Sequence, residues 1–158
     1  MKGRDGCVQL GVDVYGGALL NPWFDRDLAI AGRVTLLTAS GKLCSTLFDS
    51  ARPVAVVPNL AIHLDRDAVK QRGIKPQKDV VPLVMLGDPQ HFDFNVWLAE
   101  ILTAQDTQWQ DARVMDYELS LYDVQAPAVA GMDESWITSA RLDNLLSCFA
   151  GLSALIDA

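Results

Sequence analysis

The final stretch of the chain carries its most regular apolar pattern. From Ser139 onward, large apolar side chains recur at three- and four-residue steps, which places them on one face of a helix: Leu142, Leu145, Leu146, Phe149, Leu152 and Ile156. Small residues form a second stripe: Ser147, Ala150, Gly151 and Ala154. No charged residue lies between Asp143 and Asp157. A helix that is apolar on most sides needs burial on most sides. We therefore expect the chain to be a piece of a larger protein that covers this helix.

Alternating apolar and polar residues predict strands earlier in the chain. Residues 8–15 alternate and end at Gly16-Gly17, which indicates a turn. Residues 28–36 predict another strand, and Ser40-Gly41 predicts a hairpin turn into a partner over residues 43–48. Residues 114–124 alternate over a long stretch and predict a half-exposed strand.

The middle of the chain mixes short strand patterns with one helix. Within the β-rich stretch 53–65, a strand over residues 60–64 would place His63 on the face opposite its apolar neighbours. Residues 65–78 indicate a surface loop, and Pro82 favours an edge position for a strand over residues 80–86. Residues 95–105 predict an amphipathic helix. About six strands and two helices make the expected fold class α+β.

Composition narrows the possible partners and compartment. The formal net charge of -7 argues against nonspecific binding to nucleic acid or to an anionic membrane. The sequence has no charge-free apolar run of membrane-spanning length and no signal-peptide pattern at its start. Cys7, Cys44 and Cys148 are an odd, widely spaced set, so we expect free thiols in a reducing compartment, the cytoplasm.

Two residues stand out as candidates for chemistry, each with a structural alternative. A carboxylate at Asp143 can offset the helix macrodipole and cap free N–H groups, or it can serve as a metal ligand or catalytic group. Arg141 and Asn144 flank it with donors that could orient its oxygens. A lone histidine such as His63 is more often a hydrogen-bonding residue than a catalytic one.

Other polar clusters favour structural roles. The trio Asp25, Arg26 and Asp27 is typical of a salt-bridged surface corner, and a paired-carboxylate acid/base site is the weaker alternative because strand neighbours point to opposite faces. The polar residues near position 90 lack zinc-site spacing and are interpreted as turn and capping residues: Asp88, His91 and Asp93.

Four ordered blocks of the sequence follow the pattern of a known family: VDVYGGALLNPWFDRDLAIAGRV (12–34), VPNLAIHLDR (57–66), LSLYDVQAPAVAGMDESWI (119–137) and SARLDNLLSCFAGLSALID (139–157). Together they resemble the aspartyl aminopeptidases, a family of dinuclear zinc exopeptidases. Departures from the family pattern are modest and include residues 18–20 and 78–82. The resemblance implies a fragment: residues 1–22 as an edge strand of an α/β catalytic domain, 23–128 as an inserted β-rich dimerisation domain, and 129–158 as the return to the catalytic domain.

The resemblance also implies roles for both candidates. Asp143 matches the aspartate that bridges two zinc ions in the family, where cobalt or manganese can substitute. His63 matches a histidine that reaches the partner subunit's active site and stabilises substrate or the tetrahedral intermediate. The remaining metal ligands and the glutamate general base lie in family segments that have no counterpart in this chain. The implied function is removal of acidic N-terminal residues from peptides by a cytoplasmic homo-oligomer, a dimer that can assemble to a dodecamer.

Two alternatives to this enzyme fragment stay open from the sequence. The chain can be a non-catalytic dimerisation or interaction module without a metal site. It can also be a generic β-rich binding domain whose similarity to the family is accidental. Whether the chain is an enzyme fragment or an interaction module, the 158 residues alone are expected to be inactive as a peptidase.

Overall fold

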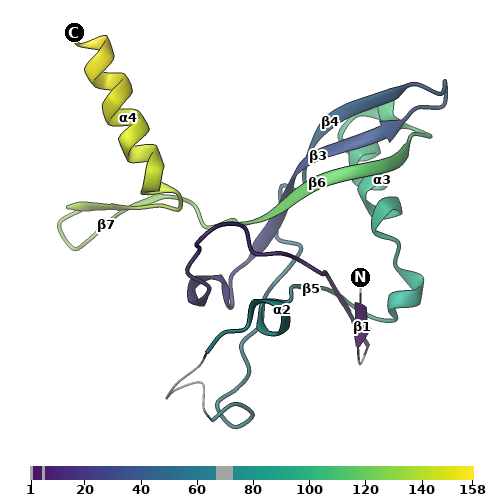
Figure 1. Ribbon diagram of the computed structural model, residues 1–158, viewed down its shortest axis with the longest axis horizontal. Coiled ribbons are helices and arrows are strands. Elements are labelled where there is room, and N and C mark those ends of the chain that lie inside the picture. Colours follow the sequence, from purple (N-terminus) through teal and green to yellow (C-terminus); the bar gives the residue numbers. More distant parts are fainter. Residues whose placement is uncertain (1, 5, 67–72) are drawn as a thin grey trace. The chain divides into compact units, whose positions relative to one another are not determined.

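Two structural units make up the chain. A computed structural model describes residues 2–4, 6–66 and 73–158 (Figure 1). Unit 1 is Met1–Val124 and unit 2 is Gln125–Ala158. Helices accompany antiparallel sheets in the described residues, which confirms the predicted α+β class.

The main sheet of unit 1 has three antiparallel strands in the order β4-β3-β6. In the register, Val34 of β3 (Leu28–Leu37) lies opposite Thr46 of β4 (Leu43–Asp49) and Tyr117 of β6 (Arg113–Asp123). The turn between β3 and β4 contains Gly41, whose φ of 79° suits a residue without a side chain. All three strands and the hairpin are predicted correctly by the alternation.

One face of this sheet is covered by α3 (Phe94–Gln105). Asp93 caps the helix, because its Oδ1 accepts hydrogen bonds from the backbone N–H groups of Asn95 and Val96 at 2.8 and 3.2 Å. Leu98 and Leu102 are buried against β-strand residues that include Val34. The predicted helix and the capping role of Asp93 are confirmed.

A second sheet of unit 1 has the order β1-β2-β5. Its strands are β1 (Lys2–Arg4), β2 (Cys7–Gln9) and β5 (Leu83–Leu86), with β5 at an edge as Pro82 predicts. The strand predicted over residues 8–15 is wrong beyond Gln9, because the short β5 offers no further partner. The Leu10 N–H still reaches the Pro82 carbonyl at 3.0 Å, but Tyr15 is 98% exposed.

A second hydrophobic cluster lies beside the first in unit 1. It consists of Phe24, Leu28, Ala55, Val57 and Val80. The stretch that carries Ala55 and Val57 is not a named strand, but it bonds to β3 and β5: the Leu28 N–H donates to Ala55 O at 2.9 Å, and the Val56 N–H to Leu83 O at 3.0 Å. The short helices of unit 1 lie in the connections: η1 (Asn21–Trp23), α2 (Pro76–Asp79), η2 (Pro89–His91) and η3 (Thr107–Trp109).

Unit 2 is a hairpin followed by a helix. The strands β7 (Ala128–Ala130) and β8 (Trp136–Thr138) pair antiparallel, and α4 (Leu142–Ile156) follows. The sequence pattern predicts no strand over residues 128–138, so this hairpin is missed. The helix is predicted correctly, yet its apolar side chains are exposed, Phe149 by 69% and Leu155 by 75%. Among the described residues, none of the helices has both the length and the hydropathy needed to cross a membrane.

Candidate functional site

Asp143 lies at the irregular beginning of α4. Its backbone is not helical, with φ -86° and ψ 111°, and the peptide bond to Asn144 is cis. Arg141 precedes the helix in the left-handed conformation, with φ 64°. The regular helix therefore runs from Leu145 onward, and Asp143 stands just before it.

The carboxylate of Asp143 does not cap the helix. Within residues 2–4, 6–66 and 73–158, it accepts no hydrogen bond and joins no ion pair, and the residue is exposed. Asn144, expected as a possible orienting neighbour, instead accepts a weak hydrogen bond from the Cys148 thiol at 3.7 Å. Both oxygens of Asp143 thus remain available, as a metal ligand requires.

A complete metal site does not form within the described part of the chain. No group of three or more histidine, cysteine, aspartate or glutamate side chains is close enough there to hold an ion. Carboxylate oxygen is a normal zinc donor, so the chemistry of Asp143 fits. A zinc site needs about four ligands, so Asp143 could supply only part of the set.

His63 lies in a turn of unit 1, and the strand predicted over residues 60–64 is wrong. The Leu64 N–H donates to Ala61 O at 2.8 Å and the Asp65 N–H to the same oxygen at 3.2 Å, which closes a turn. His63 is exposed, and its apolar neighbours Leu60 and Leu64 are 57% and 75% exposed. The alternation in this stretch does not mark a buried face, and no described strand pairs with it.

The trio Asp25, Arg26 and Asp27 joins separate parts of unit 1. Both oxygens of Asp25 accept hydrogen bonds from Asn59, one from its backbone N–H and one from its side-chain amide, each at 2.8 Å. The Arg26 guanidinium lies 3.4 Å from the Asp123 carboxylate. The contact between Asp25 and Asn59 spans 34 positions and leaves no signal in the sequence.

The cluster near position 90 is structural, as interpreted. Asp88 caps η2 by accepting a hydrogen bond from the Gln90 N–H at 2.9 Å. The His91 Nδ1 lies 3.7 Å from an Asp88 carboxylate oxygen. These residues serve turns and helix ends.

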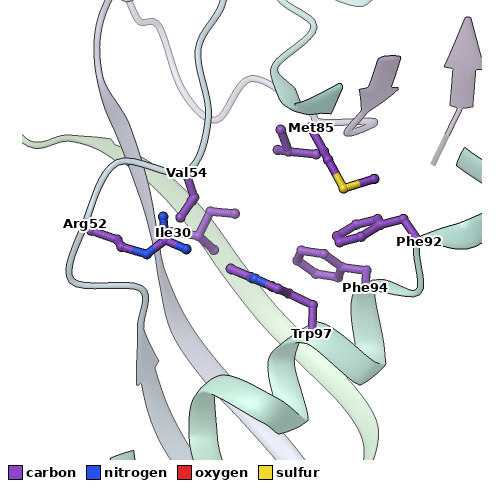
Figure 2. A pocket seen from close by; sticks show the side chains of 8 residues that line it. Ile30, Arg52, Val54, Met85, Phe92, Phe94 and Trp97 are labelled. Carbon is purple, nitrogen blue, oxygen red and sulfur yellow. The ribbon is translucent and has the colours of Figure 1, made fainter. Parts of the chain in front are cut away.

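A half-open hollow of about 150 Å³ lies in unit 1 between α3 and neighbouring segments (Figure 2). Phe94 and Trp97 of α3 stack with ring centroids 5.5 Å apart and form one side. Of the lining residues that the structure describes, Arg52 is charged and the others are apolar: Ile30, Val54, Val84, Met85, Phe92, Phe94 and Trp97. Among the described lining residues there is no carboxylate, imidazole or thiol.

Sequence comparison relates the whole chain to one family. The family described as "Aminopeptidase I zinc metalloprotease (M18)" matches residues 1–158. A "Probable M18 family aminopeptidase 2" of Ectopseudomonas mendocina is 54% identical over 155 residues, and a protein of the same description from Pseudomonas entomophila is 51% identical over 156 residues. In both cases the alignment covers 98% of this chain and 36% of the relative.

Solved structures agree with the sequence comparison. The structure titled "Cryo-EM structure of the Ape4 and Nbr1 complex" matches with a TM-score of 0.82 and 31% identity, covering 98% of this chain and 32% of that one. Chaetomium thermophilum mApe1 matches with a TM-score of 0.75 and 29% identity, over 98% and 37% of the two chains. The S. cerevisiae mApe1 dodecamer matches with a TM-score of 0.68 and 26% identity, over 99% and 34%.

Proposed function

The chain belongs to the M18 family of aminopeptidase I zinc metalloproteases, and we propose that it is part of a zinc-dependent aminopeptidase that removes aspartate or glutamate from peptide N-termini. The match over residues 1–158 carries this proposal. An accidental likeness of a generic binding domain is wrong, because the identity is 54% over 98% of the chain. The chain spans about a third of the relatives' length, 36%, so the activity is proposed for the longer protein.

Asp143 is proposed as a bridging ligand of two zinc ions, which cobalt or manganese could replace. Its two oxygens can each bind one of two cations about 3.5–4 Å apart. Its exposure and its lack of partners among the described residues support this role over capping. When bound, the ions would polarise the scissile carbonyl and activate water; Asp143 itself would hold them in register.

His63 is proposed to act in a second copy of the chain. An imidazole N–H can donate to an oxygen on which negative charge develops, which lowers the barrier to peptide hydrolysis. The exposed turn that carries His63 in unit 1 supports this role. This role requires a homo-oligomer, and we propose a dimer. The dimer can be the unit of a dodecamer, the assembly named for one structural neighbour. Free thiols at Cys7, Cys44 and Cys148 support a cytoplasmic location.

The decisive experiment removes the proposed ligand from the longer protein. Asp143→Asn should abolish stoichiometric zinc binding and lower kcat/KM on a peptide with N-terminal aspartate by roughly a thousandfold or more. Asp157→Asn, at the other end of α4, is the matched control and should change neither. Unaltered zinc content in Asp143→Asn, measured by atomic emission, would contradict the ligand assignment.

A dimerisation module without a metal site is the second candidate. It is favoured by the absence of a three-ligand cluster in the part of the chain that the structure describes. Sedimentation and zinc analysis of the 158-residue chain separate the two. A metal-free dimer supports the module, whereas metal-dependent turnover by this chain alone would show that it holds a complete site.

A further inference from the structure

Asp25 accepts two hydrogen bonds from Asn59, at the start of the loop that carries His63. We infer that Asp25 thereby positions His63 for its action in the second copy. The inference rests on the role of His63 under the proposed function. It gives Asp25 a task that the sequence of the trio does not disclose. Asp25 does not touch substrate in this scheme and acts only through the loop.

The fastening uses both oxygens of one carboxylate. Oδ1 accepts from the backbone N–H of Asn59 and Oδ2 from its side-chain amide, both at 2.8 Å. A carboxylate that accepts two parallel hydrogen bonds fixes direction as well as distance, and charge-assisted bonds are stronger than neutral ones. Asn59 is therefore held in one orientation at the point where the chain leaves the core.

Asp25 is itself fixed by the core beneath it. Phe24, which is 8% exposed, lies in a parallel bridge with Val57, which is 1% exposed. The Asp25 N–H donates to Val57 O at 2.9 Å, and Asp25 adopts a left-handed backbone conformation with φ 55°. Two buried residues thus set the carboxylate directly beside Asn59.

The apolar side chains of this loop are exposed rather than packed in the core. His63 lies four positions after Asn59, and Leu60, Ile62 and Leu64 are 55–75% exposed. Segments with few buried contacts open locally at low free-energy cost. The bonds to Asp25 and the turn closed by Ala61 O are contacts that restrict the positions open to the imidazole.

The neighbours in the trio serve other contacts and supply a control. Arg26 donates from Nε to Pro22 O at 3.2 Å and pairs with Asp123. Asp27 contributes its backbone oxygen, which accepts from the Val124 N–H at 3.1 Å, while the residue is exposed. Asp27→Ala thus removes a carboxylate two positions away without touching Asn59.

The test measures the loop and the reaction separately in the longer protein. Hydrogen exchange of residues 59–66 should become roughly ten- to a hundredfold faster in Asp25→Ala, as expected for loss of charge-assisted bonds. Asp25→Asn should restore most of the protection, because its amide oxygen still accepts from the Asn59 N–H. Asp27→Ala should exchange like the wild type. Equal exchange in Asp25→Ala and Asp27→Ala would overturn the inference and leave the proposed function standing.

Kinetics then decide whether the fastening acts through His63. Asp25→Ala should lower kcat more than it changes KM, and should lower it no further when His63→Ala is already present. An equal loss of kcat with and without His63 would overturn the positioning role. If exchange rises in Asp25→Ala while His63→Ala leaves kcat unchanged, the proposed role of His63 fails, and with it the positioning role of Asp25.

Discussion

Each unit carries a helix with an apolar stripe, but the stripe is buried in unit 1 and exposed in unit 2. In α3 of unit 1, Leu98 and Leu102 are 0% and 2% exposed, because the chain's own sheet lies against them. In α4 of unit 2, Leu152 and Leu155 are 59% and 75% exposed. Within its own unit, α4 is accompanied by a two-stranded hairpin, which is too small to bury a helix.

The difference teaches what an apolar stripe can and cannot predict. Periodicity predicts that a helix forms and which side chains seek burial, but it does not identify the surface that buries them. For α3 that surface is β4-β3-β6. For α4 we expect it in the longer protein, since the relatives extend well beyond the 36% that this chain spans.

The largest expected difference is in the free energy of unfolding, between leucine-to-alanine substitutions in α3 and in α4. Leu98→Ala should lower the free energy of unfolding of unit 1 by about 2–5 kcal/mol, because it leaves a cavity in the core. Leu152→Ala, the same substitution on exposed α4, should change stability by less than about 0.5 kcal/mol. Urea unfolding of the chain, followed by tryptophan fluorescence and helical circular dichroism, measures both. A similar loss in both variants would show that α4 is buried by this chain in solution.

Glycines give a second matched pair. A Cβ at Gly32 of β3 would collide with the Glu118 carbonyl oxygen on β6 and lie 2.9 Å from the Leu119 Cα, so Gly32→Ala should cost about 1–3 kcal/mol of unfolding free energy. A Cβ at Gly151 of α4 would meet no atom within 4 Å apart from the helix's own backbone. Gly151→Ala should therefore stabilise α4 by about 0.5–1 kcal/mol.

The longer protein sharpens the glycine comparison. If the small-residue stripe of α4 faces another backbone there, Gly151→Ala should become destabilising. Thermal unfolding of both lengths measures the change of sign. Stabilisation in both would show that the stripe remains uncovered.

Helix caps provide a smaller contrast. Asp93→Ala removes an N-cap whose oxygen accepts two hydrogen bonds, and should cost about 1 kcal/mol. Asp143→Ala removes a carboxylate that makes no such bond, and should change the stability of the 158-residue chain by less than about 0.5 kcal/mol. Urea unfolding of the two variants decides the matter. A cost of about 1 kcal/mol for Asp143→Ala would revive the capping interpretation.

The fold was predictable wherever a pattern was long and its partner lay within the chain. The strands β3 and β6 alternate over many residues, and the Ser40-Gly41 turn places β4. The strand prediction was wrong for residues 10–15, because a strand also needs a neighbouring strand for its backbone hydrogen bonds. The hairpin β7-β8 escaped because strands of three residues are too short to show a period.

The sequence suggests the candidate site residues but does not predict their structural setting. The resemblance selects Asp143 and His63, and the structure places both on exposed segments. Alternation around His63 suggested a strand, although its apolar neighbours are exposed and form a turn. The bond between Asp25 and Asn59 could not be foreseen, because it depends on Phe24 packing beside Val57.

The smallest expected effect is in the turn between β7 and β8, which is exposed and in which hydrogen bonds to Asp133 stabilise the local structure. A hydrogen bond from the Ser135 side chain, aided by backbone N–H groups, lowers the pKa of the fully exposed Asp133 below its ordinary 3.8. A carboxyl with a lowered pKa stabilises the turn above that ordinary value, and the contribution is lost as the pH falls through the folded value. Ser135→Ala should raise the pKa of Asp133, whereas Ser135→Thr keeps a hydroxyl and should preserve it. Carboxyl NMR titration measures the shift; equal pKa values in Ser135→Ala and wild type would show that the turn does not depend on this bond.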